Sequence, residues 1–109
     1  MSNIIMDILK FHHYLAAIIR SARAQANLTQ AQVANRAGVT RRYIQSLENG
    51  KQETSLSTLF SLAEAMQISP AKIIFDLESA IRDDKLPKDV LEGLPPQKIG
   101  RPPKKIENN

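Results

Sequence analysis

Four polar side chains between residues 41 and 46 could recognise the edges of DNA bases. Arg41 and Gln45 are four residues apart, and so are Arg42 and Ser46, so in a helix all four would share one face. Arginine can form paired hydrogen bonds with guanine, and glutamine can do so with adenine. A helix that presents such side chains from its first turns fits the major groove of B-DNA. We therefore expect base contacts from Arg41, Arg42, Gln45 and Ser46.

Two short helices joined by a tight turn are expected to position this face. Thr29 is predicted to cap the first helix, with Gln32 as its capping-box partner. Gly38 can adopt the left-handed conformation that ends this helix. Thr40 is then expected to cap the second helix, and Asn49-Gly50 to end it. Apolar side chains at helical spacing predict the inner faces of the two helices: Val33, Ala34 and Ala37 in the first, and Ile44 and Leu47 in the second.

Over about residues 15–78 the chain resembles the Xre/Cro-type, phage-repressor-like helix-turn-helix domains. The matching residues are Arg23, Leu28-Thr29-Gln30, Val33-Ala34, Ala37-Gly38-Val39-Thr40, Tyr43-Ile44, Leu47-Glu48-Asn49-Gly50, Leu56-Ser57-Thr58-Leu59 and Leu62-Ala63. The resemblance implies an all-α, five-helix domain whose third helix enters the major groove. Within the family, the chain is most similar to small repressors and to restriction–modification controller proteins.

The resemblance also implies roles for single residues. In the family, the residue that matches Gln30 contacts a phosphate at the start of the second helix. The family often buries an ion pair at the positions of Arg23 and Glu48, which here would fasten the first helix to the end of the third. We expect contacts with DNA phosphates from Gln30, Thr40, Tyr43, Asn49 and Lys51.

Composition excludes several other classes of protein. The chain has 109 residues, 42% of them hydrophobic and 5% aromatic, which predicts one small domain with an aliphatic core. The absence of cysteine excludes disulfides and thiolate zinc sites, and fits a reducing cytosol. His12 and His13 are adjacent on a predicted helix and point in different directions, so we expect partly exposed side chains and no metal site. No apolar run reaches transmembrane length, and the first residues lack the basic region of a signal peptide. We expect a cytoplasmic, nucleoid-associated protein that needs no cofactor and does not bind membranes.

Charge is distributed unevenly along the chain, whose net charge is +4. Residues 1–51 hold seven basic and two acidic residues. Residues 52–92 hold four basic and eight acidic residues, and residues 93–109 hold four basic residues and one acidic residue. A polyanion is therefore expected to meet the first and last parts of the chain and to avoid the middle part.

The chain is expected to divide into three parts: a helical extension over residues 1–14, the helix-turn-helix domain over residues 15–82, and a proline-rich basic tail over residues 83–109. The extension and the predicted fifth helix, residues 70–82, are both more apolar than one small domain can bury, and such surfaces often mark subunit contacts. We expect a homodimer formed through either segment or both. Two alternatives remain: the extension lengthens the first helix and packs on the domain, and the apolar side chains of the fifth helix support the tail.

The tail contains a segment that resembles an AT-hook, a short basic element that lies in the minor groove of AT-rich DNA. Its core here is Gly100-Arg101-Pro102, although the family has a basic residue where this chain has Ile99. Glycine permits close approach to the groove floor, and arginine suits its negative potential. The expected minor-groove residues are Lys98, Gly100, Arg101, Lys104 and Lys105. The alternative is a basic solubilising tail, which would still add salt-sensitive affinity for any DNA.

These observations predict a transcriptional regulator, most simply a repressor, that binds a pseudo-palindromic operator as a dimer. The chain shows no glycine-rich phosphate loop, nucleophile motif or recognisable pair of carboxylates, so we do not expect an enzyme. One alternative is an antitoxin-like interaction protein whose main partner is another protein and whose DNA binding serves autoregulation. Another is architectural DNA binding led by the tail, with little sequence preference.

Overall fold

The computed structural model describes residues 7–95, which form six helices and no strand. The helices are α1 (Ile8–Gln25), α2 (Gln30–Ala37), α3 (Arg41–Glu48), α4 (Leu56–Ala65), α5 (Pro70–Asp83) and α6 (Lys88–Gly93). The all-α class predicted from the sequence is confirmed. Within the described range, no helix is both long enough and apolar enough to cross a membrane.

Side-chain caps define where the first five helices begin. The Asp7 carboxylate accepts from the backbone amides of the first turn of α1. Thr29 forms the predicted capping box with Gln32, whose side chain accepts from the Thr29 amide at 2.8 Å. Since each such cap stabilises a helix by about 1 kcal/mol, the sequence specifies these starting points locally. Thr40, Ser55 and Ser69 cap α3, α4 and α5.

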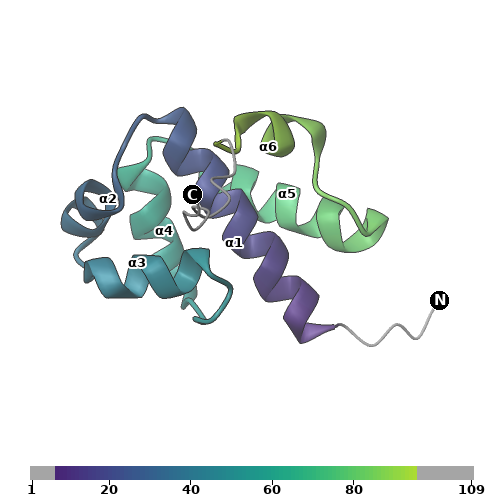
Figure 1. Ribbon diagram of the computed structural model, residues 1–109, viewed down its shortest axis with the longest axis horizontal. Coiled ribbons are helices and arrows are strands. Elements are labelled where there is room, and N and C mark those ends of the chain that lie inside the picture. The colour runs from purple at the N-terminus through teal and green to yellow at the C-terminus, as the bar shows by residue number, and fades with distance from the viewer. Residues whose placement is uncertain (1–6, 96–109) are drawn as a thin grey trace, which may run out of the picture.

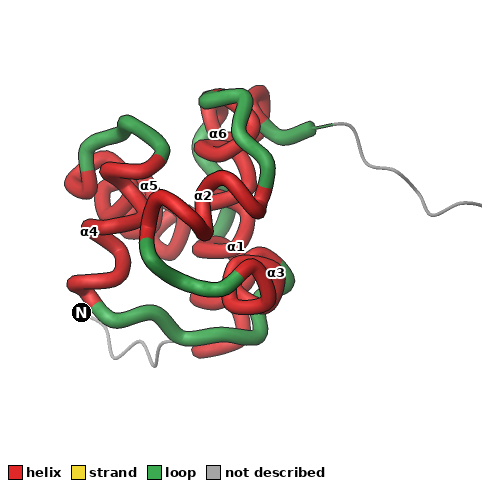
Figure 2. Tube along the Cα trace, turned by 90° about the vertical axis from the view of Figure 1, so that its left-hand side faces the viewer, coloured by secondary structure: helices red, strands yellow, loops and turns green. Residues whose placement is uncertain are grey.

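The core is aliphatic, as the low aromatic content predicted. Five side chains from five different helices are 0% exposed: Ile19, Val33, Ile44, Leu62 and Ile73. The long helix α1 lies at the centre and packs against α3, α5 and α6, while α2 packs against α3 and α4. In both views of the molecule, α3 lies in the lower part and α6 in the upper part (Figures 1 and 2). The core therefore buries the inner face of α3 and leaves its outer face exposed.

The predicted N-terminal extension is part of α1 in the structure. The helix begins at Ile8 and continues without a break past residue 14, so the described part of the extension lengthens the first helix. Asp84, just beyond α5, secures it: its Oδ1 lies 2.8 Å from Lys10 Nζ and accepts a 2.8 Å hydrogen bond from the Tyr14 hydroxyl. Leu9 nevertheless remains 75% exposed. Residues 1–6 lie outside the described range.

A sixth helix adds to the five that the resemblance implied. Val90 of α6 is 3% exposed and packs into the core, and the Ser21 hydroxyl of α1 donates to its carbonyl oxygen at 2.8 Å. Lys72 of α5 binds Asp89 at 2.7 Å. Residues 88–93, which the sequence assigned to the tail, therefore pack on the domain. The AT-hook-like residues Lys98, Gly100, Arg101, Lys104 and Lys105 lie outside the described range.

Candidate nucleic-acid interface

The turn between α2 and α3 sets the direction of the second helix. Gly38 ends α2 at φ 75°, in the left-handed region, and its amide donates to the Ala34 carbonyl. A Cβ atom at this position would meet nothing within 4 Å, so backbone conformation alone favours glycine here. Thr40 then returns to an extended conformation, and its hydroxyl oxygen accepts from the Tyr43 amide at 3.0 Å. The predicted turn chemistry is therefore present.

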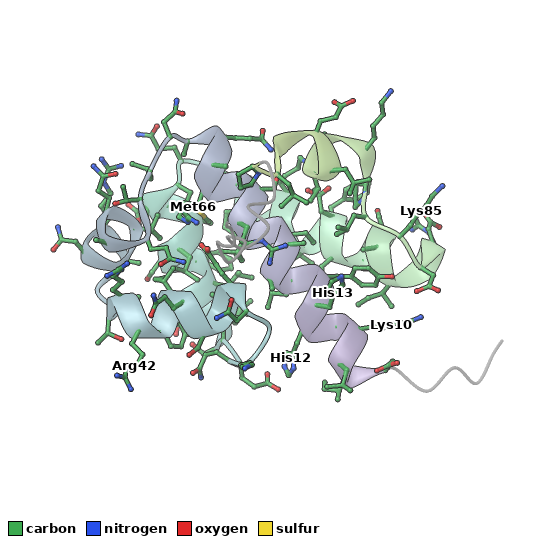
Figure 3. The ribbon with its side chains drawn as sticks, viewed as in Figure 1. Lys10, His12, His13, Arg42, Met66 and Lys85 are labelled. Atoms are coloured by element: carbon green, nitrogen blue, oxygen red, sulfur yellow. The ribbon has the colours of Figure 1, made fainter. Side chains whose placement is uncertain are left out.

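Helix α3 has one buried face and one exposed face. Ile44 and Leu47 are 0% and 1% exposed and anchor the inner face in the core. The four expected base-reading residues lie on the opposite side: Arg41, Arg42 and Gln45 are exposed and Ser46 is partly exposed. Figure 3 shows the Arg42 side chain pointing away from the body of the molecule at its lower edge. This arrangement leaves the guanidinium and amide groups of α3 accessible to a groove.

A buried ion pair fastens the end of α3 to α1. Arg23 Nε lies 2.6 Å from Glu48 Oε2, and Arg23 Nη2 donates to Glu48 Oε1 at 2.8 Å. The hydrogen bonds to Glu48 raise the pKa of Arg23 above its ordinary value, despite the opposing effect of burial. Arg20, one turn earlier on α1, donates to the Glu48 backbone carbonyl at 2.8 Å. Two arginines of α1 therefore hold the side chain and the backbone of one α3 residue.

The expected phosphate-contact residues surround α3. Gln30, at the start of α2, donates to Glu48 Oε1 at 3.1 Å, so it belongs to the same buried cluster as Arg23. The Tyr43 hydroxyl donates to the Glu53 carbonyl at 3.0 Å and so binds the loop that follows α3. Thr40, Asn49 and Lys51 are exposed. The structure thus distributes these residues over both ends of α3, the start of α2 and the α3–α4 loop, which we define as residues 49–55.

The charge of this surface is dominated by basic residues. Between residues 8 and 52 the only acidic residue is Glu48, and its carboxylate is buried and paired. Arg41, Arg42 and Lys51 are exposed, and the next acidic residue along the chain after Glu48 is Glu53, in the α3–α4 loop. A surface of this sign attracts a polyanion such as the DNA backbone.

Two contacts at this surface were not predicted from the sequence. The hydrogen bond from Arg20 to Glu48 joins α1 to α3, and the one from Gln30 to Glu48 joins the start of α2 to the end of α3. The spacing of Arg20 and Arg23, three residues apart, indicates that they share a face of α1. Nothing in that spacing indicates their common partner.

A second polar cluster lies away from α3, in a half-open cavity of about 320 Å³ between α1, α5 and α6. The Lys72 ammonium group lies between Asp76 Oδ2 at 2.6 Å and Asp89 Oδ2 at 2.7 Å. Burial opposes the charge of Lys72, but hydrogen bonds to Asp76 and Asp89 raise its pKa above the ordinary value. The hydrogen bond from Lys72 also lowers the pKa of Asp89. Because Asp76 belongs to α5 and Asp89 to α6, the cluster joins these two helices.

Residues 19–73, which include the whole of this turn and α3, match the helix-turn-helix family HTH_3. The chain belongs to this family, as the resemblance to Xre/Cro-type domains indicated. It is 42% identical over 60 residues to the control protein C.SmaI of Serratia marcescens, covering 55% of this chain and 71% of that protein. It is 33% identical over 67 residues to the immunity repressor of Bacillus phage phi105, covering 62% of this chain and 46% of that protein.

Solved structures agree on the fold. The clp gene regulator ClgR from Corynebacterium glutamicum aligns with a TM-score of 0.63 and 27% identity, over 68% of this chain and 79% of that chain. The restriction–modification controller protein C.AhdI from Aeromonas hydrophila aligns with a TM-score of 0.52 and 30% identity, over 62% of this chain and 96% of that chain. The named relatives are therefore transcriptional regulators of repressor and controller type. The predicted similarity to phage-type repressors and controller proteins is confirmed.

Proposed function

We propose that this protein is a sequence-specific transcriptional regulator that inserts α3 into the major groove of its operator. The observation that carries the proposal is the rigid presentation of one polar helix face. The core holds the inner face of α3 through Ile44 and Leu47, and Arg20 and Arg23 hold its C-terminal end. Side chains that contact bases should be held in position before binding, because ordering them during binding costs free energy and reduces affinity. Arg41, Arg42, Gln45 and Ser46 are assigned to base contacts.

Contacts with phosphates are assigned to Gln30, Thr40, Tyr43, Asn49 and Lys51. Gln30 has two amide hydrogens, and one of them is used by Glu48. The second can donate to a phosphate, so the same side chain can link the buried ion pair to the DNA backbone. The Thr40 hydroxyl accepts from the Tyr43 amide and still has its own hydrogen to donate. These contacts would set the register of α3 without themselves reading sequence.

A symmetric dimer is proposed to occupy two half-sites. Helix α5 leaves three apolar side chains substantially exposed: Ile74 at 44%, Phe75 at 60% and Ile81 at 37%. Contiguous exposed apolar surface commonly marks a protein contact, and two-fold dimers of this fold class bind half-sites about one helical turn apart. Occupancy of promoter DNA would then cause repression. The names of the relatives, a control protein and an immunity repressor, support this kind of role.

A protein partner is the second candidate, and the apolar residues of α4 favour it. Leu56 and Phe60 are one turn apart on α4 and are 64% and 52% exposed. They add apolar surface beyond that of α5. A partner protein bound there would make this chain an antitoxin-like module that also regulates its own promoter. A stoichiometric complex recovered with the tagged full chain, and abolished by Phe60→Glu, would favour this candidate.

Selection of binding sites from random DNA duplexes at near-physiological salt tests the proposed function. An inverted repeat with one defined spacing is expected from a dimer that reads bases through α3. Enrichment of AT-rich DNA without a repeat would instead make the basic tail the main DNA-binding element. The absence of any enrichment would contradict sequence-specific binding and favour the protein-partner function.

A further inference from the structure

The second turn of α1 lies against the α3–α4 loop. A Cβ atom built on Gly50 would stand 3.6 Å from the His12 carbonyl oxygen, an ordinary packing distance. Leu9 and His13 on the same turns of α1 line a shallow hollow together with Glu48, Asn49 and Gly50. The described part of the N-terminal extension therefore contacts the loop that carries the proposed phosphate contacts Asn49 and Lys51.

Within this contact, His12 faces a carboxylate. Its Nε2 lies 3.2 Å from Glu53 Oε2, in a geometry that falls short of a hydrogen bond, and the nitrogen is shielded from solvent. The His12 side chain is 16% exposed and that of Glu53 is 73% exposed. Without a proton on Nε2, two acceptor atoms would face one another. A proton on Nε2 removes this repulsion, and a charged imidazolium forms an ion pair with the Glu53 carboxylate.

The His12–Glu53 pair lies on the same side of the molecule as α3. In Figure 3 the side chains of His12 and Arg42 both point downward from the lower edge. The Tyr43 hydroxyl, one of the proposed phosphate contacts, binds the backbone carbonyl of Glu53 itself. Glu53 would therefore bring a negative charge close to the DNA backbone, where it weakens binding.

We propose that His12 is a positioning residue for the α3–α4 loop, and that its protonation strengthens operator binding. This role rests on the proposed function, since the loop matters to affinity only if α3 binds DNA. The imidazolium would neutralise Glu53, hold the loop on α1 and add a positive charge beside the phosphates. The complex then binds more protons than the free protein, so affinity rises as the pH falls from 8 to 6.

Other charged groups lie near His12. Arg20 and the paired Glu48 line the adjacent hollow, Lys51 precedes Glu53 on the loop, and Lys10 pairs with Asp84 beyond α5. Side chains of these types keep their charges between pH 6 and 8. His13 is exposed and lies next to His12 on α1, so it provides the matched control.

The test measures the dissociation constant of the full chain for its selected operator at pH 6, 7 and 8 and constant ionic strength. The wild type is expected to bind about three- to fivefold more tightly at pH 6 than at pH 8, the range expected for one exposed ion pair. His12→Gln should remove most of this pH dependence, whereas His13→Gln should retain it. Glu53→Gln should bind at pH 8 about as tightly as the wild type binds at pH 6.

Two outcomes would overturn the role of His12: a wild-type pH profile in His12→Gln, or loss of the profile in His13→Gln alone. Glu53 is exposed, so Glu53→Gln should fold normally even if His12→Gln does not. An unchanged profile in Glu53→Gln would also contradict the proposal. If the wild type bound no DNA sequence specifically at any pH, both this role and the proposed function would be overturned. Specific binding whose pH dependence is unchanged in His12→Gln would overturn this role alone.

Discussion

At the scale of single residues, Glu48 connects the stability of the domain to the placement of α3. Its carboxylate accepts from Arg23 and Gln30, and its backbone carbonyl accepts from Arg20. The side chain is 3% exposed, so its charge depends on these partners in place of water. Glu48 is thus a structural residue at the end of the helix that is proposed to contact bases, whereas Arg41 and Arg42 are exposed on the same helix and make no comparable contact.

Replacement of Arg23 by alanine should destabilise the fold. It leaves the buried Glu48 carboxylate without its main cationic partner, a change that typically costs about 3–5 kcal/mol. The free energy of unfolding from urea titration measures this effect. Arg41→Ala, on the exposed face of α3, is the control and should change that free energy by less than about 0.5 kcal/mol. Equal stability of the Arg23 variant and the wild type would show that the ion pair contributes little.

Replacement of Arg41 or Arg42 by alanine should act on recognition. Each is expected to cost about 1–3 kcal/mol of binding free energy on the selected operator and to relax the base preference at one position. Dissociation constants on the operator and on its single-base variants measure both effects. Lys88→Ala removes an exposed charge from α6, away from α3, and should change neither. Full discrimination in both arginine variants would refute the assignment of this face of α3.

At the scale of helices, α6 adds a layer to the five-helix domain. It is attached to α1 and α5 by one apolar side chain, one hydrogen bond from the Ser21 hydroxyl to a backbone carbonyl, and one ion pair. The ion pair is exposed and contributes little, so most of the attachment comes from the buried Val90. The described range ends at residue 95, two residues beyond α6, so this attachment also fixes the position of the end of that range.

Val90→Ala should weaken this attachment. Removal of two buried methyl groups is expected to cost about 1–2 kcal/mol of unfolding free energy. Its neighbour Leu91 is 53% exposed, so Leu91→Ala should cost much less and serves as the control. Thermal unfolding of both variants provides the comparison. Equal losses of stability in the two variants would mean that α6 does not pack through Val90.

At the scale of the whole molecule, two exposed surfaces differ in their chemistry. The outer face of α3 is polar and basic, and the outer face of α5 exposes Ile74, Phe75 and Ile81 together with the charged Glu78 and Arg82. The proposed function assigns DNA to the first surface and a second copy of the chain to the second. The relative position of these two faces would determine the spacing between the two half-sites of an operator.

Phe75→Glu should shift the protein from dimer to monomer. A carboxylate at the centre of an apolar contact carries a desolvation cost that a self-complementary interface meets twice. Sedimentation equilibrium measures the association state, and operator affinity should fall along with it. Leu91→Glu introduces the same charge on α6 and should leave the mass unchanged. A dimer that persists in Phe75→Glu would locate the interface elsewhere, such as at Leu9 on α1.

Deletion of residues 98–109 should weaken binding to all DNA sequences alike. The segment has four basic residues and one acidic residue, and basic contacts with phosphates give affinity that falls steeply with salt. The affinity measured at several salt concentrations should therefore show a shallower slope after the deletion. A selective loss of affinity for sites flanked by AT-rich DNA would favour the AT-hook interpretation of Gly100 and Arg101.

The sequence alone determined features that depend on neighbours within a few residues. The capping box of Thr29, the left-handed turn at Gly38 and the inner face of α3 all follow from local hydrogen bonding and helical spacing, and all agree with the structure. The family resemblance then supplied the arrangement of the five helices. Together these features were enough to predict the fold class and the face of α3 that is exposed.

Only the tertiary structure decided which distant residues meet. Gln30 and Arg20 converge on Glu48, His12 faces Glu53 from 41 positions away, and α6 packs on α1. Such contacts arise when the burial of the core brings helix surfaces together, and local propensity carries no information about them. A short helix such as α6 also has too few residues to show a periodic pattern. The sequence therefore determined how α3 is built, and the packing of α1 against it decided how α3 is held.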